Sequence, residues 1–269
     1  MAEIEEVTIP EDLKESMNLA EQFGISLEEH EGFFDLEQVK MLVYGESGSG
    51  KTVFASTWKD CVFIDIDKGM SSITRRVSRI PIHSKPNQMA WEALVRAITF
   101  LEDPEAHNFK TVVLDSLNEM QTISMDYVIA KYPEIRRPYG GLASQSDYGK
   151  LLYDFDHEIR RMKALPLNVV FIGQVAPQQY ETDVVQPQLI GKHTARNISR
   201  MMDIIGYLYK QEGGDGEATK KDRVMVFDAI NHVTKDRSDM LPFNITNPTY
   251  AELYAYWEKQ FEQPTEEGV

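Results

Sequence analysis

The sequence predicts an α/β fold with a mainly parallel β-sheet flanked by helices, and three observations favour it. Near-continuous apolar runs alternate with segments of helical periodicity, which is the pattern of strands buried on both faces. A glycine-rich loop joins the first apolar run to a helix-compatible segment. Beyond Gly173, two strand-like runs surround a turn-rich segment, which predicts an antiparallel hairpin on the C-terminal side of the chain.

Strands and helices are expected to alternate from residue 39 onward, because apolar runs of strand length and amphipathic stretches of helix length follow one another. The predicted strands are 39–44, 61–66, 80–83, 110–115 and 167–173, and the predicted helices are 52–58, 87–102, 117–132 and 146–164. The hairpin strands are predicted at 203–209 and 223–230, around the turn-rich segment 212–222.

The two ends of the chain are expected to add helices to this core. Thr8 and Glu11 have capping-box spacing, and Gly24 fits the end of the helix that they would start. Asn247 and Pro248 precede a second segment with large apolar residues at helical spacing. We therefore predict an acidic N-terminal helical extension at 1–35, a core at 36–245, and a C-terminal helix with an acidic tail at 246–269.

Composition limits the class of protein. The chain has 269 residues and a single cysteine, Cys61, so no disulfide or cysteine metal site forms within one chain, and a reducing compartment is expected. No apolar stretch reaches 18 residues, and the first ten residues lack a basic start followed by an apolar segment. We expect a cytoplasmic protein with no membrane span.

The charge is distributed unevenly. The net charge is −15, and residues 1–38 contain 12 acidic residues and one base, Lys14, which gives that segment −11 and leaves −4 for the rest. The sum argues against a nucleic-acid partner, but a nearly neutral core can still present basic loops. The acidic segment is either a solvated face or a regulatory arm that competes with a polyanion.

The glycine-rich loop matches the pattern GxxxxGK[ST] in full. In this pattern, glycines let backbone N–H groups turn inward around phosphate oxygens, the lysine neutralises the β- and γ-phosphates, and the hydroxyl ligates Mg²⁺. A helix N-terminus behind the loop favours the same anion. We therefore predict nucleotide binding by Gly45, Glu46, Ser47, Gly48, Ser49, Gly50, Lys51 and Thr52.

Polar residues end three of the predicted strands. Asp115 ends the run 111–115 in the form of a Walker B element and would hold Mg²⁺ with Thr52, because ligands of parallel sheets gather at strand carboxyl ends. Asp65 and Asp67 end the second strand, where either acid could instead cap a turn. We favour Asp67 as the catalytic base, with Glu119 as the alternative.

The third such strand ends at Gln174, whose amide could hydrogen-bond the γ-phosphate or the attacking water. The segments FIDID (63–67), VVLDS (112–116) and VFIGQ (170–174) resemble those of RecA-type ATPases, in the same chain order. The resemblance implies bound ATP, a water-activating acid at Asp67 and a γ-phosphate sensor at Gln174. Asp67 is one methylene shorter than the family's usual glutamate, which bears on the efficiency of hydrolysis.

The triplet Lys235-Asp236-Arg237 resembles the KxR element of RecA-like proteins and ring helicases. The resemblance implies that Lys235 and Arg237 reach the γ-phosphate of a neighbouring copy. The alternative is an exposed basic turn. Head-to-tail contacts of this kind give a homo-oligomer that is a ring if the rotation closes and a filament if it does not.

The resemblance extends over residues 36–245. Together with DYG (147–149) and the ending at 235–242, it looks most like small phage-encoded RecA-like single-strand annealing and recombination proteins. It implies a Mg²⁺-dependent, DNA-stimulated ATPase that assembles on single-stranded DNA in the host cell cytoplasm. A single-strand-binding protein is an implied further partner.

Two loops are the candidates for contact with DNA. The first, 131–149, combines basic, aromatic and glycine residues, and the second, 175–192, follows Gln174. Cations follow a phosphate backbone and aromatic rings stack on bases, although arginine and tyrosine also cover apolar surface in ordinary loops. The predicted DNA-binding residues are Arg136, Arg137, Tyr139, Tyr180 and Lys192.

Three other classes share parts of this pattern. A ring-forming helicase core and a RecA-like regulatory ATPase of the KaiC type have the same motifs. A P-loop kinase of small molecules commonly carries an arginine-rich lid, and the sequence has no clear one. A non-enzymatic ATP switch is compatible with an aspartate at position 67.

Overall fold

The computed structural model of the protein describes residues 26, 33–83, 85–133, 136–137, 141–178, 183–191, 193–212 and 221–261. Contacts divide the chain into two compact units, Met1–Phe34 and Asp35–Val269. The helices and strands described below all belong to the second unit. The helix predicted after Thr8 lies outside the described residues, and the domain boundaries predicted at residues 35 and 245 stay predictions.

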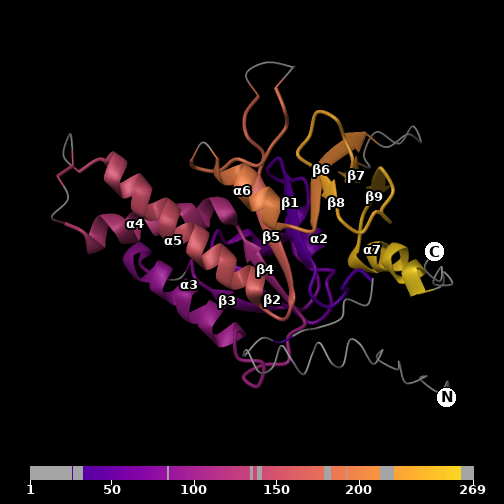
Figure 1. The fold of residues 1–269 in the computed structure, drawn as a ribbon, viewed down its shortest axis with the longest axis horizontal. Coiled ribbons are helices and arrows are strands. Elements are labelled where there is room, and N and C mark those ends of the chain that lie inside the picture. The colour runs from indigo at the N-terminus through magenta and orange to yellow at the C-terminus, as the bar shows by residue number, and fades with distance from the viewer. Residues whose placement is uncertain are drawn as a thin grey trace. The chain divides into compact units, whose positions relative to one another are not determined.

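Within the described residues, nine strands form one sheet in the order β3-β2-β4-β5-β1-β6-β7-β9, with β8 paired to β6 (Figure 1). They are β1 (Lys40–Gly45), β2 (Cys61–Asp65), β3 (Ser78–Pro81), β4 (Thr111–Asp115), β5 (Asn168–Gln174), β6 (Ile204–Glu212), β7 (Lys221–Val226), β8 (Lys235–Asp236) and β9 (Asn244–Thr246).

The first six strands of this order are parallel, which brings their carboxyl ends to one edge of the sheet. Gly45 at the end of β1 is in register with Gln174 at the end of β5, and Asp65 at the end of β2 is in register with Asp115 at the end of β4. This edge is where ligands of parallel sheets bind. The strand-end residues singled out in the sequence therefore lie along the same edge.

Helices cover both faces of the sheet. Alternate residues of each strand point to opposite faces, so an apolar strand presents side chains that must be buried on both. Leu42 and Tyr44 of β1 belong to a buried cluster with residues of α3, α4, α5 and α6. Met41 and Val43 are equally buried on the other face. The helices are α2 (Lys51–Ala55), α3 (Asn87–Leu101), α4 (Leu117–Lys131), α5 (Gln145–Ala164), α6 (Thr194–Met201) and α7 (Tyr250–Trp257), with 3₁₀ turns η1 (Gly69–Ser72) and η2 (Glu258–Phe261).

The predicted fold class is confirmed: a mainly parallel sheet flanked by helices, with an antiparallel hairpin. The hairpin strands β6 and β7 pair in antiparallel register from Tyr207 with Val226 to Glu212 with Lys221, and β6 also pairs in parallel with β1. Among the α-helices and strands described, α6, β8 and β9 were not predicted. Across the described residues, no helix has the length and apolar character needed to cross a membrane.

Candidate nucleotide-binding and catalytic site

The glycine-rich loop leaves β1 at Gly45 and enters α2 at Lys51. Gly48 and Gly50 have φ angles of 75° and 105°, a left-handed conformation that glycine adopts without steric cost. A Cβ atom on Gly45 would lie 2.1 Å from the carbonyl oxygen of Leu208 in β6. The glycines therefore allow the loop to curl on itself and to lie against β6.

Lys51 is buried inside the loop, with 6% of its surface exposed. Its Nζ donates to the carbonyl oxygens of Gly45 and Glu46, both at 2.8 Å, and to Gln174 Oε1 at 3.3 Å. Burial lowers the pKa of Lys51 to about 8, against the opposing effect of Asp115 and other carboxylates. The ammonium group is thus held where the pattern predicts phosphate, beside the predicted sensor glutamine.

Thr52 and Asp115 meet as the sequence predicted for a metal site. Thr52 Oγ1 donates to Asp115 Oδ2 at 2.8 Å. Burial, and then the charge of Asp67, raise the pKa of Asp115 to about 7, although the Thr52 hydrogen bond and Lys51 act in the opposite direction. Because Asp115 is buried and lies near other carboxylates, a bound cation would be stabilised at this position.

These two oxygen donors fit Mg²⁺, which binds proteins through one or two hard ligands and completes its shell with water and phosphate. Within the described residues, no group of three or more His, Cys, Asp or Glu side chains is arranged to hold a metal. Thr52 and Asp115 would therefore hold the ion together with the phosphates of the nucleotide. The described residues contain no metal site built from His, Cys, Asp and Glu side chains alone.

A cavity of about 290 Å³ joins the predicted residues. It lies at the carboxyl edge of the sheet and is lined from the loop, from the segment after β2, and from the ends of β4 and β5. The structure thus brings together residues that are far apart in the sequence, such as Lys51 and Gln174, which are 123 positions apart. The lining includes Ser47, Gly48, Gly50, Lys51, Thr52, Asp67, Asp115, Gln174 and Arg223.

The two acids at the end of β2 have different surroundings. Asp65 is fully buried, accepts from Lys68 N at 3.0 Å and pairs with His83 at 3.1 Å, so it fixes the turn after the strand. Asp67 is exposed, accepts from Gly69 N at 2.8 Å and lines the cavity. Only Asp67 of this pair reaches the predicted phosphate site.

Glu119 stays the alternative to Asp67 as catalytic base. Burial, and then the charge of Asp67, raise the pKa of Glu119, so the two carboxylates interact. Both line a second pocket of about 390 Å³, and Asp67 also lines the phosphate cavity. Asp67 is therefore nearer to the loop than Glu119, and the role of base stays a prediction for it.

Gln174 connects the loop to the segment that follows β5. Its side chain accepts from Lys51, and its backbone N–H donates to Asn118 Oδ1 at 2.9 Å. Asn118 Nδ2 in turn donates to Gln188 O at 2.7 Å, while Gln188 N donates to Gln174 O at 2.8 Å. Gln121 exchanges two hydrogen bonds with the backbone of Ile190, at 3.1 and 2.7 Å. The start of α4 therefore fixes residues 188–190 beside Gln174.

Lys235 and Arg237 do not reach the glycine-rich loop of their own chain. Lys235 pairs in register with Ile205 at the start of β6, at the end of the sheet where β1 begins and opposite the loop. Its ammonium donates to Ser199 O at 3.5 Å and also to Met202 O. Arg237 is exposed and pairs with Asp203 at 2.8 Å. Their predicted role toward a neighbouring copy stays a prediction.

The predicted DNA-binding residues are described in part. Arg136 is exposed, whereas Arg137 is 9% exposed and binds both carboxylate oxygens of Asp147, at 3.1 and 2.9 Å. This pairing lowers the pKa of Asp147 to about 2 and ties the start of α5 to the chain after α4. DNA contact stays a prediction for both arginines. The other three, Tyr139, Tyr180 and Lys192, lie outside the described residues.

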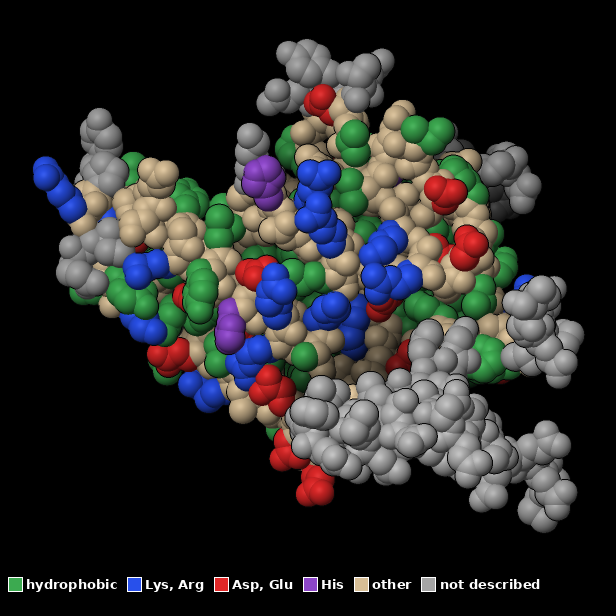
Figure 2. All heavy atoms as spheres, in the orientation of Figure 1, with side chains coloured by type: hydrophobic (Ala, Val, Ile, Leu, Met, Phe, Trp, Pro, Cys, Tyr) green, Lys and Arg blue, Asp and Glu red, His purple; other side chains and the backbone are tan. Residues whose placement is uncertain are grey.

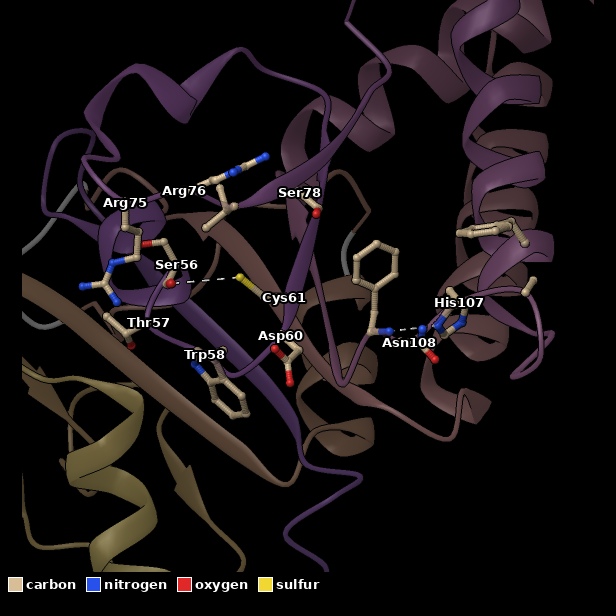
Figure 3. Close-up of a pocket in the computed structure, with 14 residues that line it drawn as sticks. Ser56, Thr57, Trp58, Asp60, Cys61, Arg75, Arg76, Ser78, His107 and Asn108 are labelled. Carbon is tan, nitrogen blue, oxygen red and sulfur yellow. Dashed lines mark hydrogen bonds between the residues drawn. The ribbon is translucent and has the colours of Figure 1, made fainter.

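A larger pocket, of about 690 Å³, lies elsewhere (Figure 3). Cys61 at the start of β2 lines it, at the edge of the sheet opposite the loop, and its thiol donates to Ser56 O at 4.0 Å. Burial raises the pKa of Cys61 to about 11, so the thiol stays protonated and is a poor nucleophile. Arg75 and Arg76 also line this pocket, which is separate from the phosphate site.

Sequence reasoning missed four residues around the site: Asn118, Gln121, Lys210 and Arg223. Asn118 and Gln121 stand three positions apart just after the Walker B strand, and that spacing places them on one face of a helix, which was the available signal. Lys210 and Arg223 meet only through the register of the hairpin, for which the sequence gives no local signal.

The loop, the buried lysine and the Thr52–Asp115 pair at the edge of a parallel sheet define a P-loop domain of the ATPase class. A family model described as an AAA domain (AAA_24) matches residues 37–238. Since this match extends over more than half of the chain, the chain belongs to the AAA_24 family of AAA domains.

Two further comparisons were made. No curated protein matches it. Among solved structures, it is similar to the KaiC-like protein PH0186 from the hyperthermophilic archaeon Pyrococcus horikoshii OT3, with 13% identity, a TM-score of 0.39, and coverage of 72% of this chain and 79% of that chain.

Proposed function

We propose that this protein is a RecA-like ATPase that assembles on single-stranded DNA and promotes annealing or strand exchange in phage recombination. Mg·ATP would lie between two copies of the chain. One copy supplies Lys51, Thr52 and Asp115, and the neighbouring copy supplies Lys235 and Arg237. A single-strand-binding protein is the further partner that the resemblance implies.

One observation carries the proposal: Gln174 links the phosphate site to the second candidate DNA loop. Its side chain contacts Lys51, while its backbone is bonded to Asn118 and Gln188. Any group that takes over the Lys51 ammonium changes the bonding of Gln174, and the same residue anchors the segment at 188–190. We propose that these hydrogen bonds couple nucleotide state to the position of residues 188–190.

The surface supports a polyanionic partner despite the net charge of −15. Figure 2 shows Lys and Arg side chains gathered over α5 and α6, and the exposed residues there include Arg160 and Lys163 on α5 and Arg196 and Arg200 on α6. At the far end of α5, Lys150 Nζ lies 4.0 Å from the centre of the Tyr132 ring. Tyr132 is half-buried, and cations combined with accessible aromatic rings are a common means of holding single strands.

The residues divide the work of hydrolysis between them. Bound Mg²⁺ supplies charge neutralisation on the phosphates. Lys51 adds a fixed positive charge in a site where burial makes it stronger than in water. Asp67 orients the attacking water and accepts its proton, and Gln174 positions the same water. The guanidinium of Arg237 from the neighbouring copy stabilises the charge that develops during transfer.

The first test is the ATPase rate with and without single-stranded DNA across a salt series. We expect DNA to stimulate turnover by roughly tenfold or more at low salt and the stimulation to fade as salt rises, because phosphate contacts release counterions. Addition of duplex DNA of the same length is the control. Turnover that is indifferent to DNA, with formation of a phosphorylated small molecule, would mean a kinase, and directional unwinding would mean a helicase.

A further inference from the structure

The hairpin formed by β6 and β7 extends beyond the end of β1 and over the glycine-rich loop. The pairing of β1 with β6 ends at Tyr44 and Tyr207, and β6 continues to Glu212. Leu208 O lies so close to Gly45 that a Cβ atom added to this glycine would be only 2.1 Å from it. The residues of the hairpin beyond position 208 are therefore the ones that face the loop.

Two cations of this hairpin point at the loop. Lys210 of β6 and Arg223 of β7 are directly opposite one another in register, so their side chains emerge on the same face. A Cβ on Gly48 would lie 3.8 Å from Lys210 Nζ, and a Cβ on Gly50 would lie 2.3 Å from Arg223 Nε. Lys210 thus lies next to Gly48, and Arg223 lies next to Gly50, the two loop glycines with left-handed backbone.

Like charges directly opposite one another on paired strands are unfavourable unless an anion lies near them. Within the described residues, neither Lys210 nor Arg223 forms an ion pair with a carboxylate, and Arg223 Nε is buried without a hydrogen-bond partner. A buried donor with no acceptor costs free energy. The arrangement is that of a cation pair prepared for an anionic ligand.

The position of Arg223 is fixed by the backbone around it. Arg223 N donates to Asn247 Oδ1 at 3.0 Å, and Arg223 O accepts from Asn247 N. Asn247 itself has a φ of 51°, a left-handed conformation that asparagine tolerates better than most residues. The side chain of Arg223 lines the same cavity as Lys51 and Asp115, so no movement of the hairpin is needed to bring it to the site.

We infer that Arg223, with support from Lys210, binds the phosphate chain of the nucleotide from within the same chain. The inference rests on the proposed function, since it takes ATP as the anion. It separates two sets of cations: Arg223 and Lys210 act in the isolated protomer, whereas Lys235 and Arg237 act across a contact between copies. Arg223 is thus a binding residue that every protomer carries before assembly.

The test is ATP and inorganic triphosphate binding by the isolated protomer, with Arg223→Ala, Lys210→Ala and the exposed Arg96→Ala of α3 as the matched control. We expect Arg223→Ala to weaken both ligands by roughly 10- to 50-fold, because it removes charge-assisted hydrogen bonds. Lys210→Ala should weaken them by about three- to fivefold, because its exposed ammonium is screened by water, and Arg96→Ala should change neither.

Thermal unfolding of the ligand-free variants distinguishes binding from a structural role. Arg223→Ala should leave the midpoint unchanged or raise it, since it removes one of two like charges. Unchanged affinity in Arg223→Ala overturns the inference, and so does weakened binding of ATP but not of triphosphate. If Lys51→Ala also keeps full ATP affinity, the proposed function itself fails. If Lys51→Ala loses ATP affinity and Arg223→Ala keeps it, only the role of Arg223 is rejected.

Discussion

Replacing Lys51 with alanine should weaken ATP binding at least about 100-fold, because a buried ammonium worth roughly 3 kcal/mol to bound phosphates is removed. Lys51 is 6% exposed and lines the phosphate cavity. Isothermal titration of the protomer with Mg·ATP measures the effect. Hydrolysis should be lost in parallel, since the same charge acts on the transferred phosphate.

The control for this variant is Lys59→Ala, which removes an exposed lysine of the same unit. It should bind Mg·ATP like the unaltered protein. The ligand-free Lys51→Ala protein should keep its fold, because Lys51 bonds only to loop carbonyls and to Gln174. Equal affinities of the Lys51 and Lys59 variants would show that the loop is not the nucleotide site.

Replacing Asp115 with asparagine should reduce the rate of Mg²⁺-dependent hydrolysis about 100-fold or more. The same change should stabilise the ligand-free protein at pH 8. The first effect follows from loss of the metal carboxylate. The second follows because burial and Asp67 raise the pKa of Asp115 from 3.8 to about 7. We expect a gain in the free energy of unfolding on the order of 1–2 kcal/mol, which is less than the whole pKa shift would give, because Asp115 lines a cavity in which water can solvate the ionised group.

The pH dependence gives the sign of this effect. A carboxyl group with a raised pKa in the folded state contributes stability that is fully present below pH 3.8 and is lost as the pH rises through about 7. Urea unfolding should therefore show similar stability for Asp115→Asn and the unaltered protein near pH 4, and a growing advantage for the variant toward pH 8. The exposed Asp228→Asn is the control. An advantage that is independent of pH would contradict the assignment.

Most of the fold could be predicted because apolar runs decide it. The strands β1, β2, β4 and β5 are buried along their length, so their sequences read as continuous apolar segments. The exceptions are β8 and β9, with two and three residues, and α6, in which only Ile198 and Met201 are buried. Strands of two or three residues leave no periodic signal, and α6, with eight residues, is too short for its one apolar face to be distinguished from a loop.

The phosphate site could be predicted for a different reason. Lys51 and Thr52 belong to one continuous motif, and Asp67, Asp115 and Gln174 end strands whose carboxyl ends meet at one edge. Convergence on that edge follows from parallel topology alone. The sequence offered two acids at the end of β2 and favoured Asp67, and the structure shows Asp65 buried beside His83 and Asp67 lining the cavity.

The remaining contacts depend on register and on tertiary pairing, which the sequence does not encode locally. Arg223 reaches the loop because it pairs with Lys210 across the hairpin, and a shift by one residue would turn both away. Arg137 was predicted as a DNA contact from its place in a basic loop, but its pairing with Asp147 is visible only in three dimensions.

The central claim is that ATP is hydrolysed between two copies of this chain, and subunit mixing tests it most directly. Lys51→Ala and Arg237→Ala are each prepared, and the ATPase rate of each alone and of their equal mixture is measured on single-stranded DNA. Each variant alone should be inactive. The mixture should regain about a quarter of full activity, because random head-to-tail assembly joins an intact loop to an intact Arg237 at about one contact in four. A mixture as inactive as its components would contradict the claim.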